Sequence, residues 1–283
     1  MIQPVDEKQI EPRWVGWAEW AGLIAIMVLA TYLRYWRIGE VPPGFNSDEA
    51  VGAVGALKTL REGLSYSYEG QGGGGVLGFY FAAAAFYLFG PSIETIRGLA
   101  AWASLVGLFA HYWAVRELFR GPTLAVAALR PSYSEKGQIT APSPSSKLNQ
   151  ARAIAAISSL GLAVSVWHLQ ASRVAFAGIG VPFLMLPSIY FLWRGLNRPT
   201  DNQNRQSKWT FILSGIFLGG LMYIYLSGAF APPLYAAFFI GQWLLVWIIQ
   251  KIRPGQTTLD SSTPQNSRFF GQLEPPVAYL TSQ

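Results

Sequence analysis

The sequence predicts an all-α integral membrane protein, a polytopic bundle of about seven transmembrane helices. Of its 283 residues, 51% are hydrophobic and only 13% are charged, and the mean hydropathy is +0.27. Soluble domains carry about 25% charged residues. The apolar residues also form runs without Asp, Glu, Lys or Arg, and a helix needs about 18 or more such residues to cross the hydrocarbon core. These observations exclude a disordered chain and argue against a water-soluble enzyme.

The apolar runs give the expected spans in order. The first span is centred on residues 21–33, and aromatic side chains flank it as in the belts at membrane interfaces: Trp14, Trp17, Trp20, Tyr35 and Trp36. The next runs cover residues 76–89, 98–115, 153–172, 174–193 and 209–250. The last run is too long for one helix, and Gly228 and Pro232-Pro233 divide it into a sixth and a seventh span.

The remaining segments define the domain organisation. We expect one transmembrane domain over residues 1–253, with a first external loop at about 37–75. A polar insertion at about 131–150 is rich in Ser and Pro and has the composition of a flexible segment. Residues 254–283 form a polar C-terminal tail.

Charge and cysteine content exclude several functions. The net charge is +6, but the basic residues stand singly or in pairs between apolar runs. They therefore set membrane orientation and do not bind nucleic acid. The chain has no cysteine, which excludes disulfides and thiolate chemistry. His111 and His168 are too far apart in sequence to suggest a zinc site.

The charges leave the orientation in conflict. If the N-terminus is cytoplasmic, the first loop lies outside, and one crossing each for the second and third spans places residues 116–152 outside as well. The positive-inside rule favours the cytoplasm for that basic stretch. One of these two placements must be wrong, and the sequence does not decide which. The second run is short and flanked by glycines, so an incomplete crossing is one alternative.

The first external loop contains a predicted amphipathic helix. Pro42-Pro43-Gly44 favours a turn, and Asn46 followed three residues later by Glu49 fits a capping box. We therefore expect a helix from about Asp48 to Gly63, lying flat on the membrane surface. Its expected apolar face consists of Ala50, Ala53, Val54, Leu57 and Leu60.

This helix begins with two adjacent carboxylates, Asp48 and Glu49. Acids at a helix N-terminus complement the helix dipole, an interaction worth about 0.3–1 kcal/mol. Alternatively, the pair supplies a general base or a metal-binding carboxylate at the water boundary of the bilayer. Residue chemistry alone leaves both interpretations open.

A succession of short blocks resembles the GT-C glycosyltransferases of the protein O-mannosyltransferase and aminoarabinose-transferase type. The blocks are, in order, YLRYWR (32–37), PPG (42–44), DEA (48–50), LFGPSIETIRGLAA (88–101), RELF (116–119) and WHLQASRVAF (167–176). Their order and spacing cover most of residues 30–250.

The resemblance implies an activity and a site. Enzymes of this family transfer a sugar from a polyprenyl-phosphate donor to a lipid, glycan or protein acceptor on the non-cytoplasmic face, which implies a place in the cell membrane and a role at the cell envelope. By resemblance, Asp48 is the general base that deprotonates the acceptor, and Glu49 assists it. Cationic groups must bind the leaving phosphate, and the proposed set is Arg97, His168, Arg173, Lys58 and Arg61.

Each cation also has a structural alternative. Arg34 and Arg37 end a hydrophobic helix, where snorkelling anchors are usual. Lys58 and Arg61 fit a solvated helix face, and Arg97 fits a purely topological role. His111, inside the third span, is expected to be a packed, hydrogen-bonded histidine.

Other aspects of function stay open at this stage. Asp48, if any residue, would bind a divalent cation such as Mg²⁺ or Mn²⁺, although two carboxylates are an incomplete ligand set. Family members are considerably longer, so we expect a truncated relative. The alternatives are a non-catalytic membrane protein and a lipid transporter or flippase.

Overall fold

The computed structural model describes residues 13–63, 75–120, 144–196 and 204–252. In this part of the chain the regular elements are all helices, and there is no strand. The polar tail at 254–283 and most of the polar insertion lie outside the described residues. The elements are α1 (Arg13–Tyr35), α2 (Ser47–Glu62), α3 (Val76–Phe89), α4 (Ile93–Arg120), α6 (Pro144–Val164), α7 (Val166–Arg173), η1 (Ala177–Ile179), α8 (Gly180–Leu196), α9 (Asn204–Ile224), η2 (Leu226–Phe230) and α10 (Ala231–Ile252).

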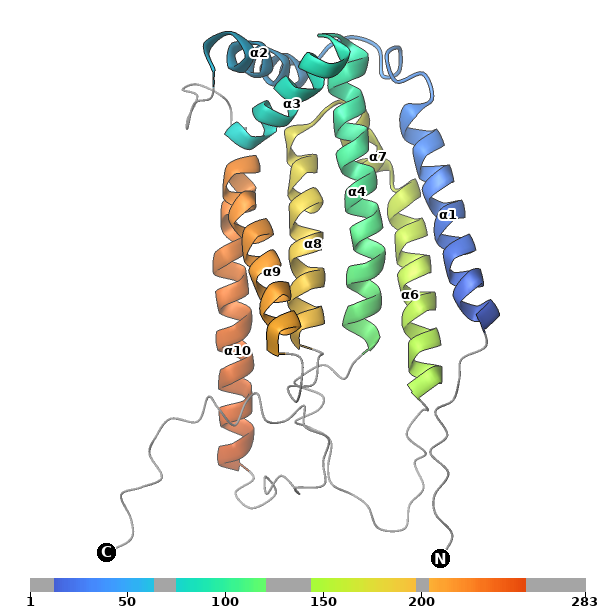
Figure 1. The fold of residues 1–283 in the computed structure, drawn as a ribbon, viewed down its shortest axis with the longest axis vertical. Coiled ribbons are helices and arrows are strands. Elements are labelled where there is room, and N and C mark those ends of the chain that lie inside the picture. Colours follow the sequence, from blue (N-terminus) through green and yellow to red (C-terminus); the bar gives the residue numbers. More distant parts are fainter. Residues whose placement is uncertain (1–12, 64–74, 121–143, 197–203, 253–283) are drawn as a thin grey trace, which may run out of the picture.

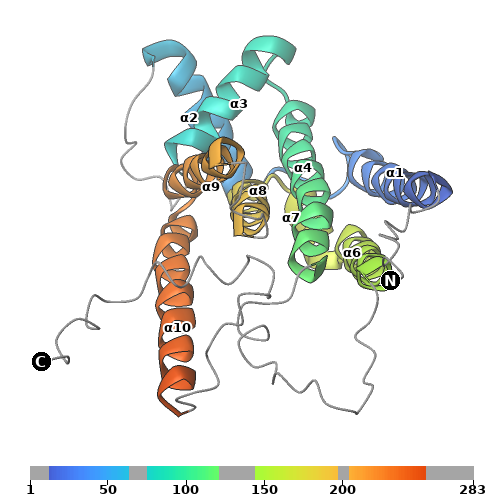
Figure 2. The ribbon, with the colours of Figure 1, turned by 60° about the horizontal axis from the view of Figure 1, so that its bottom comes forward.

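The helices form an upright bundle with a cap at one end (Figure 1). Helices α1, α4, α6, α8, α9 and α10 run upright, whereas α2 and α3 lie across the top of the bundle. Within the bundle α4 packs against α6 and α8, and α8 packs against α9. Figure 2 shows that α1 and α10 lie on the periphery.

Four helices are long and apolar enough to cross a membrane: Val15–Tyr35, Ile93–Arg120, Ala177–Leu196 and Leu226–Leu245. A fifth span results if α6 and α7, which meet at a bend of 54°, are taken together. Val76–Phe89 and Lys208–Ile224 are apolar but shorter. The chain is therefore an all-helical protein with four to five candidate membrane spans in its described part, fewer than the predicted number of about seven spans.

Contacts at the two ends of α1 show the direction of α4 relative to α1. At the cap end, Tyr35 donates a hydrogen bond to the carbonyl of Gly98, near the start of α4 (2.9 Å). At the other end, Glu19 forms an ion pair with Arg116, near the end of α4 (2.7 Å). Helix α4 is therefore antiparallel to α1, and residues 116–120 lie at the end of the bundle where α1 begins.

This arrangement requires α3 to stay in the cap. The N–H of Gly75, just before α3, donates to the carbonyl of Ile224 at the end of α9 (3.1 Å). Helix α3 also packs along α2, and α4 starts directly after it at the same end (Figure 1). The second apolar run therefore does not return to the opposite end, which removes the orientation conflict found in the sequence.

Two differences from the predicted elements have local causes. Helix α6 begins at Pro144, so the last residues of the predicted polar insertion are helical. The predicted span 153–172 is divided at Ser165, whose ψ of 122° is not helical.

The upright helices approach one another closely because small side chains lie between them. Six such side chains are completely buried: Ala30, Ala101, Ala155, Ala163, Ser159 and Ser188.

Candidate functional site

Helix α2 begins and ends as its sequence predicts. The Asn46 side chain accepts a hydrogen bond from the N–H of Glu49, and the Glu49 carboxylate accepts one from the N–H of Asn46, both at 2.9 Å. Gly63 ends the helix with φ of +84°, in the left-handed region that glycine adopts readily. The predicted capping box is confirmed.

The buried face of α2 differs from the predicted apolar face. The buried residues are Glu49, Gly55, Ala56 and Thr59, whereas Val54 and Leu60 are 60% and 46% exposed. The reason is the close approach of α3, because a Cβ at Gly55 would collide with the ring of Phe79. Small residues therefore face α3, and Val54 and Leu60 face outward. Ala53 and Leu57 of the predicted apolar face do pack against the buried cluster between α2, α3 and α4.

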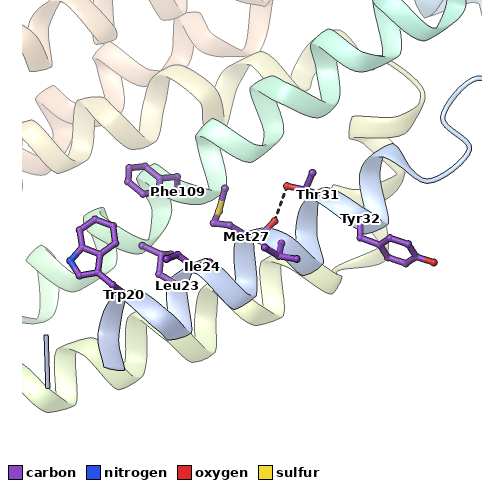
Figure 3. A pocket seen from close by; sticks show the side chains of 8 residues that line it. Trp20, Leu23, Ile24, Met27, Thr31, Tyr32 and Phe109 are labelled. Carbon is purple, nitrogen blue, oxygen red and sulfur yellow. Dashed lines mark hydrogen bonds between the residues drawn. The ribbon is translucent and has the colours of Figure 1, made fainter. Parts of the chain in front are cut away.

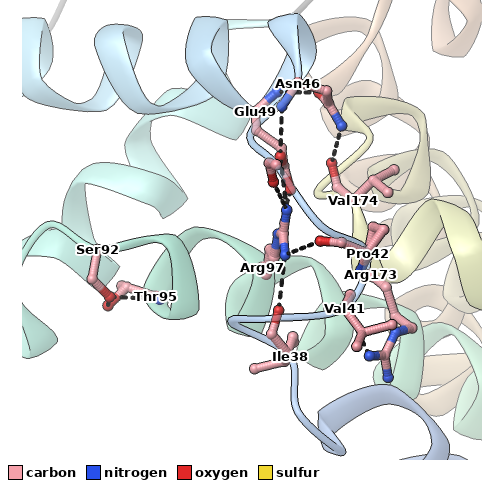
Figure 4. A network of polar contacts seen from close by, with 11 residues as sticks. Ile38, Val41, Pro42, Asn46, Glu49, Ser92, Thr95, Arg97, Arg173 and Val174 are labelled. Carbon is pink, nitrogen blue, oxygen red and sulfur yellow. Dashed lines mark hydrogen bonds and ion pairs between the residues drawn. The ribbon is translucent and has the colours of Figure 1, made fainter.

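A buried ion pair connects α2 with α4. Arg97 Nε lies 2.6 Å from Glu49 Oε1, and the side chains of these two residues are 1% and 0% exposed. The guanidinium also donates to the other Glu49 oxygen (3.2 Å) and to the carbonyls of Ile38 (3.0 Å), Pro42 (3.0 Å) and Gly44 (2.6 Å). Figure 4 shows this network. An arginine has five N–H donors, so all of them are used within the protein.

Arg173, at the end of α7, binds the end of α1 and the first part of the loop between α1 and α2. It donates hydrogen bonds only to backbone carbonyls: Leu33 (2.7 Å), Arg34 (3.3 Å), Trp36 (2.9 Å) and Val41 (2.7 Å). The side chain is 8% exposed. Arg97 and Arg173 together bind seven carbonyls between residues 33 and 44, and they thereby fix the segment that leads into α2.

Arg34 is buried inside the bundle and is not the snorkelling anchor that its place at a helix end favours. It is 0% exposed and donates to the Ser104 hydroxyl (2.6 Å) and to the carbonyls of Ala30 and Ala163 (both 3.1 Å). It also contacts His168 Nδ1 at 2.8 Å. The prediction failed because three of these partners, Ser104, Ala163 and His168, come from other helices that are distant in sequence, α4, α6 and α7. His168 is thus a neighbour of Arg34, and its buried Nε2 has no hydrogen-bond partner among the described residues.

Asp48 lies in the first turn of α2 and, unlike Glu49, is exposed. Lys58 and Arg61 are also exposed, on later turns of α2. At 1.5 Å per residue they lie about 15 Å and about 20 Å from Asp48 along the helix axis. Lys58 is also 3.8 Å from Glu62. The structure therefore brings Glu49, Arg97, Arg173, Arg34 and His168 to the cap end of the bundle but separates Lys58 and Arg61 from Asp48.

Two other predictions concern single side chains. His111 Nδ1 lies 3.1 Å from the Ser159 hydroxyl, so this residue is the packed, hydrogen-bonded histidine that was predicted. Arg37 forms an ion pair with Glu40 and lies over the Trp36 ring, 5.7 Å from its centroid. Arg37 remains exposed, as an interfacial anchor requires.

A second charge cluster lies at the opposite end of the bundle, and sequence reasoning missed it. Glu19 accepts from Arg152 Nε (2.7 Å) and from the Tyr112 hydroxyl (2.9 Å), and it forms an ion pair with Arg116 (2.7 Å). The available signal was an acid at the start of a membrane span, next to apolar and aromatic residues. Such a residue requires a cationic partner.

The described part of the site has few groups that could bind a metal ion. Over the described ranges, no group of three or more His, Asp or Glu side chains gathers to hold an ion. Mg²⁺ is held through one or two carboxylates plus substrate phosphates, and Asp48 offers one carboxylate. The role of Asp48 as a ligand for Mg²⁺ or Mn²⁺ therefore stays a prediction.

The arrangement of the two acids suits a general base at Asp48 better than one at Glu49. Buried arginines immobilise the loop in front of α2, so the helix start is held in a fixed position. The exposed carboxylate of Asp48 at that position can accept a proton from a bound hydroxyl group. Glu49, with Arg97 on both oxygens, acts as a structural acid in this conformation.

Comparisons with known proteins identify no relative. No protein-family model matches the chain. No curated protein and no solved structure is significantly similar to it. The resemblance to GT-C glycosyltransferases therefore rests on the sequence blocks alone.

Proposed function

We propose that the chain is a multi-pass glycosyltransferase of the GT-C type, transferring a sugar from a polyprenyl-phosphate donor to a lipid, glycan or protein acceptor. The observation that carries the proposal is the exposed Asp48 at the start of a helix that is fixed by the buried Glu49–Arg97 pair. The succession of sequence blocks supports the reaction class, and the apolar bundle supports a place in the cell membrane.

The distribution of charge supports a non-cytoplasmic position for Asp48. The described residues at the end opposite the cap include two acids, Glu19 and Glu117, and nine basic residues (Figure 1). The basic residues are Arg13, Arg116, Arg120, Lys147, Arg152, Arg194, Arg205, Lys208 and Lys251. Basic residues favour the cytoplasmic side. The cap, whose acids and bases are nearly balanced, then lies on the outer face, where polyprenyl-phosphate sugars are used in the family that the sequence resembles.

In this proposal α2 lies at the membrane surface and α3 remains in the cap. Helix α9 is apolar from Lys208 to Ile224 and lies beside α8, so we place it across the membrane with α1, α4, α6–α7, α8 and η2–α10. Its last carbonyl is satisfied by the N–H of Gly75 (3.1 Å), and irregular backbone is tolerated at membrane depth where protein buries it.

The proposed reaction is a displacement with inversion at the anomeric carbon. The Asp48 carboxylate takes the proton of the acceptor hydroxyl while that oxygen forms a bond to the anomeric carbon. The bond between this carbon and the phosphate oxygen breaks, and its electron pair leaves with the polyprenyl phosphate. The protein supplies a base on one face of the sugar, and cations must stabilise the phosphate on the other.

We propose different roles for the predicted phosphate-binding cations. Arg97 and Arg173 are positioning residues in the described conformation, because binding a phosphate would require them to release loop carbonyls. His168 is engaged with Arg34. Lys58 and Arg61 are exposed but far along α2, which suits contacts with lipid headgroups better than with the phosphate next to the reacting sugar.

A non-catalytic membrane protein is the second candidate function. One observation favours it: Arg97 uses all its donors, and Glu49 both its oxygens, to hold the cap together. In that case Asp48 would only complement the dipole of α2.

Turnover of donors distinguishes the two candidates. The purified full chain, reconstituted in lipid, is incubated with a panel of polyprenyl-phosphate hexoses and pentoses together with extracted envelope acceptors. We expect release of free polyprenyl phosphate from one class of donor. If the folded chain releases none from any donor, the non-catalytic function is the better account.

A further inference from the structure

A break in the candidate span formed by α6 and α7 is bridged by Arg34 of α1. The two helices meet at Ser165 with a bend of 54°, and such a break leaves carbonyl groups at the end of α6 without a partner in the helix. Arg34 Nη1 donates to one of them, the carbonyl of Ala163 (3.1 Å), and Arg34 Nη2 contacts His168 Nδ1 in the first turn of α7 (2.8 Å). One side chain therefore joins the two sides of the break.

Arg34 contacts neutral groups inside the bundle. The outer side of the same helix is apolar and aromatic, where Ile24 and Tyr32 are 57% and 60% exposed (Figure 3). Arg34 itself is 0% exposed, and its remaining contacts are with the Ser104 hydroxyl and the carbonyl of Ala30. None of these four partners is a carboxylate, so the buried guanidinium depends on neutral acceptors.

The contact between Arg34 and His168 requires a neutral imidazole. A guanidinium has donors and no acceptor, so Nδ1 of His168 must present its lone pair and the ring proton lies on Nε2. A protonated imidazole carries an N–H group on both ring nitrogens and cannot accept a hydrogen bond. Two cations would then lie 2.8 Å apart in the interior of the bundle. Uptake of a proton by His168 must therefore break the contact.

The groups around His168 do not offset this repulsion. Helix α7 packs against α1, α4, α6 and η1, and the groups of the described residues that act on the charge of His168 are Arg34 and His111 of α4, both bases. Three further charged side chains of α4 and α7 lie at the cap end, and the one acid among them is exposed at the start of α4: Glu94, Arg97 and Arg173. The remaining charged residues of α1, α4 and α6 lie at the opposite end of the bundle (Figure 1), and η1 contains none.

Helix α7 connects this contact with the loop before α2. His168 lies in its first turn, and Arg173, its last residue, donates to four carbonyls between Leu33 and Val41. A movement of α7 about Ser165 would therefore pull Arg173 away from the loop or move the loop with it. His168 is only partly buried, so its protonation does not require unfolding of the bundle.

We propose that Arg34 and His168 form a pH-sensitive latch. While His168 is neutral, the latch closes the break between α6 and α7 and keeps Arg173 on the loop before α2. At acidic pH His168 takes up a proton, its contact with Arg34 breaks, and α7 moves about Ser165. The latch controls the position of Asp48 whatever reaction the cap carries out, so it does not depend on the proposed function.

Distances between spin labels measure the state of the latch in the full chain. The chain has no cysteine, so Trp17→Cys combined with Trp167→Cys places one label on α1 and one on α7, at positions that are 73% and 87% exposed. Double electron–electron resonance on the protein in liposomes should give one narrow distance at pH 7.5. At pH 5.0 we expect a second, broader population. The ratio of open to closed molecules should rise about thirtyfold, because a free imidazole has a pKa of about 6.5.

Three controls assign the response to His168. In the labelled parent, His168→Asn places an amide oxygen near the position of Nδ1, which accepts from Arg34 at any pH, so its distances should be the same at both pH values. His111→Asn removes the other histidine of the chain and should respond as the labelled parent does. The label pair Trp17→Cys and Ile216→Cys, between α1 and α9, should not change with pH.

The latch is refuted if the distances between α1 and α7 in the labelled parent are the same at both pH values, or if His168→Asn still responds. Loss of the response in His111→Asn would assign the titration to that histidine, and a change in the α1–α9 pair would show a rearrangement of the whole bundle. If His168→Asn alters the distances already at pH 7.5, His111→Asn and the α1–α9 pair still decide, because histidine is the side chain that titrates in this pH range.

Discussion

Arg97 connects α4 with α2 and with the segment between α1 and α2 through its five hydrogen bonds. Its replacement should therefore loosen the contacts among these three parts of the cap. In Arg97→Met the buried Glu49 carboxylate loses its partner, and breaking one side of a buried ion pair costs about 3–5 kcal/mol. We expect a large fall in the melting temperature of the protein in detergent, measured by intrinsic fluorescence.

A double-mutant cycle provides the control for this prediction. Glu49→Gln alone should also destabilise the protein, because the guanidinium is then buried without a counter-charge. The double variant should cost less than the sum of the two single changes, because it leaves no unpaired charge. Strictly additive effects would show that the two side chains do not interact in the folded protein.

The start of α2 could be predicted from the sequence because its signals are local, whereas the burial of Arg34 could not. The capping box of α2 lies within four consecutive residues, so sequence alone reveals it. Arg34 is buried by contacts with Ser104, Ala163 and His168, which are 70, 129 and 134 residues away. No local pattern indicates which side of a helix such distant partners will occupy.

At the scale of the elements, the contact between α2 and α3 depends on the absence of a side chain at Gly55. In Gly55→Ala the new methyl group meets the Phe79 ring, and such overpacking costs about 1–3 kcal/mol. Gly52→Ala is the matched change on the same helix, because its Cβ would lie 3.8 Å from Ile96 Cδ1, an ordinary contact.

The two alanine variants should therefore differ in sign. Gly52→Ala should be neutral or gain about 0.4–1 kcal/mol by reducing the freedom of the unfolded chain, whereas Gly55→Ala should lose stability. Thermal unfolding of both proteins under identical conditions measures the difference. Equal stability of the two would contradict the close packing of α2 on α3.

The apolar runs of the sequence predicted where helices lie better than they predicted which helices cross the membrane. The apolar runs at 76–89 and 209–224 correspond to real helices, α3 and α9, because an apolar run needs the same residues whether it crosses a bilayer or packs in a cap. Whether such a helix crosses the membrane or packs in the cap depends on the helices around it. Gly75 and Gly55 let α3 lie against the end of α9 and along α2, contacts that a hydropathy pattern does not reveal.

At the scale of the whole molecule, the topology makes a prediction that is independent of function. The chain has no cysteine, so single cysteines can be introduced without a background. Glu62→Cys and Ser92→Cys flank α3 and should react with a membrane-impermeant maleimide from the same side of intact cells. Arg120→Cys should react only after permeabilisation.

The pair flanking α3 decides the number of crossings. If Glu62→Cys and Ser92→Cys react from opposite sides, α3 crosses the membrane, and the placement of the basic end in the cytoplasm is wrong. All three positions are exposed, so a failure to react reflects the side of the membrane and not burial in the protein.

The proposed function depends on the reactivity of one exposed carboxylate, that of Asp48, and one measurement tests this reactivity most directly. The rate of polyprenyl phosphate release is compared between the wild-type chain, Asp48→Asn and Glu62→Gln, the last removing an exposed acid at the other end of the same helix. With folding verified in all three, we predict that Asp48→Asn lowers the rate by about 10²–10⁴-fold, the range for loss of a general base, and that Glu62→Gln keeps the wild-type rate. A rate for Asp48→Asn equal to that of wild type would contradict the assignment of Asp48 as the base.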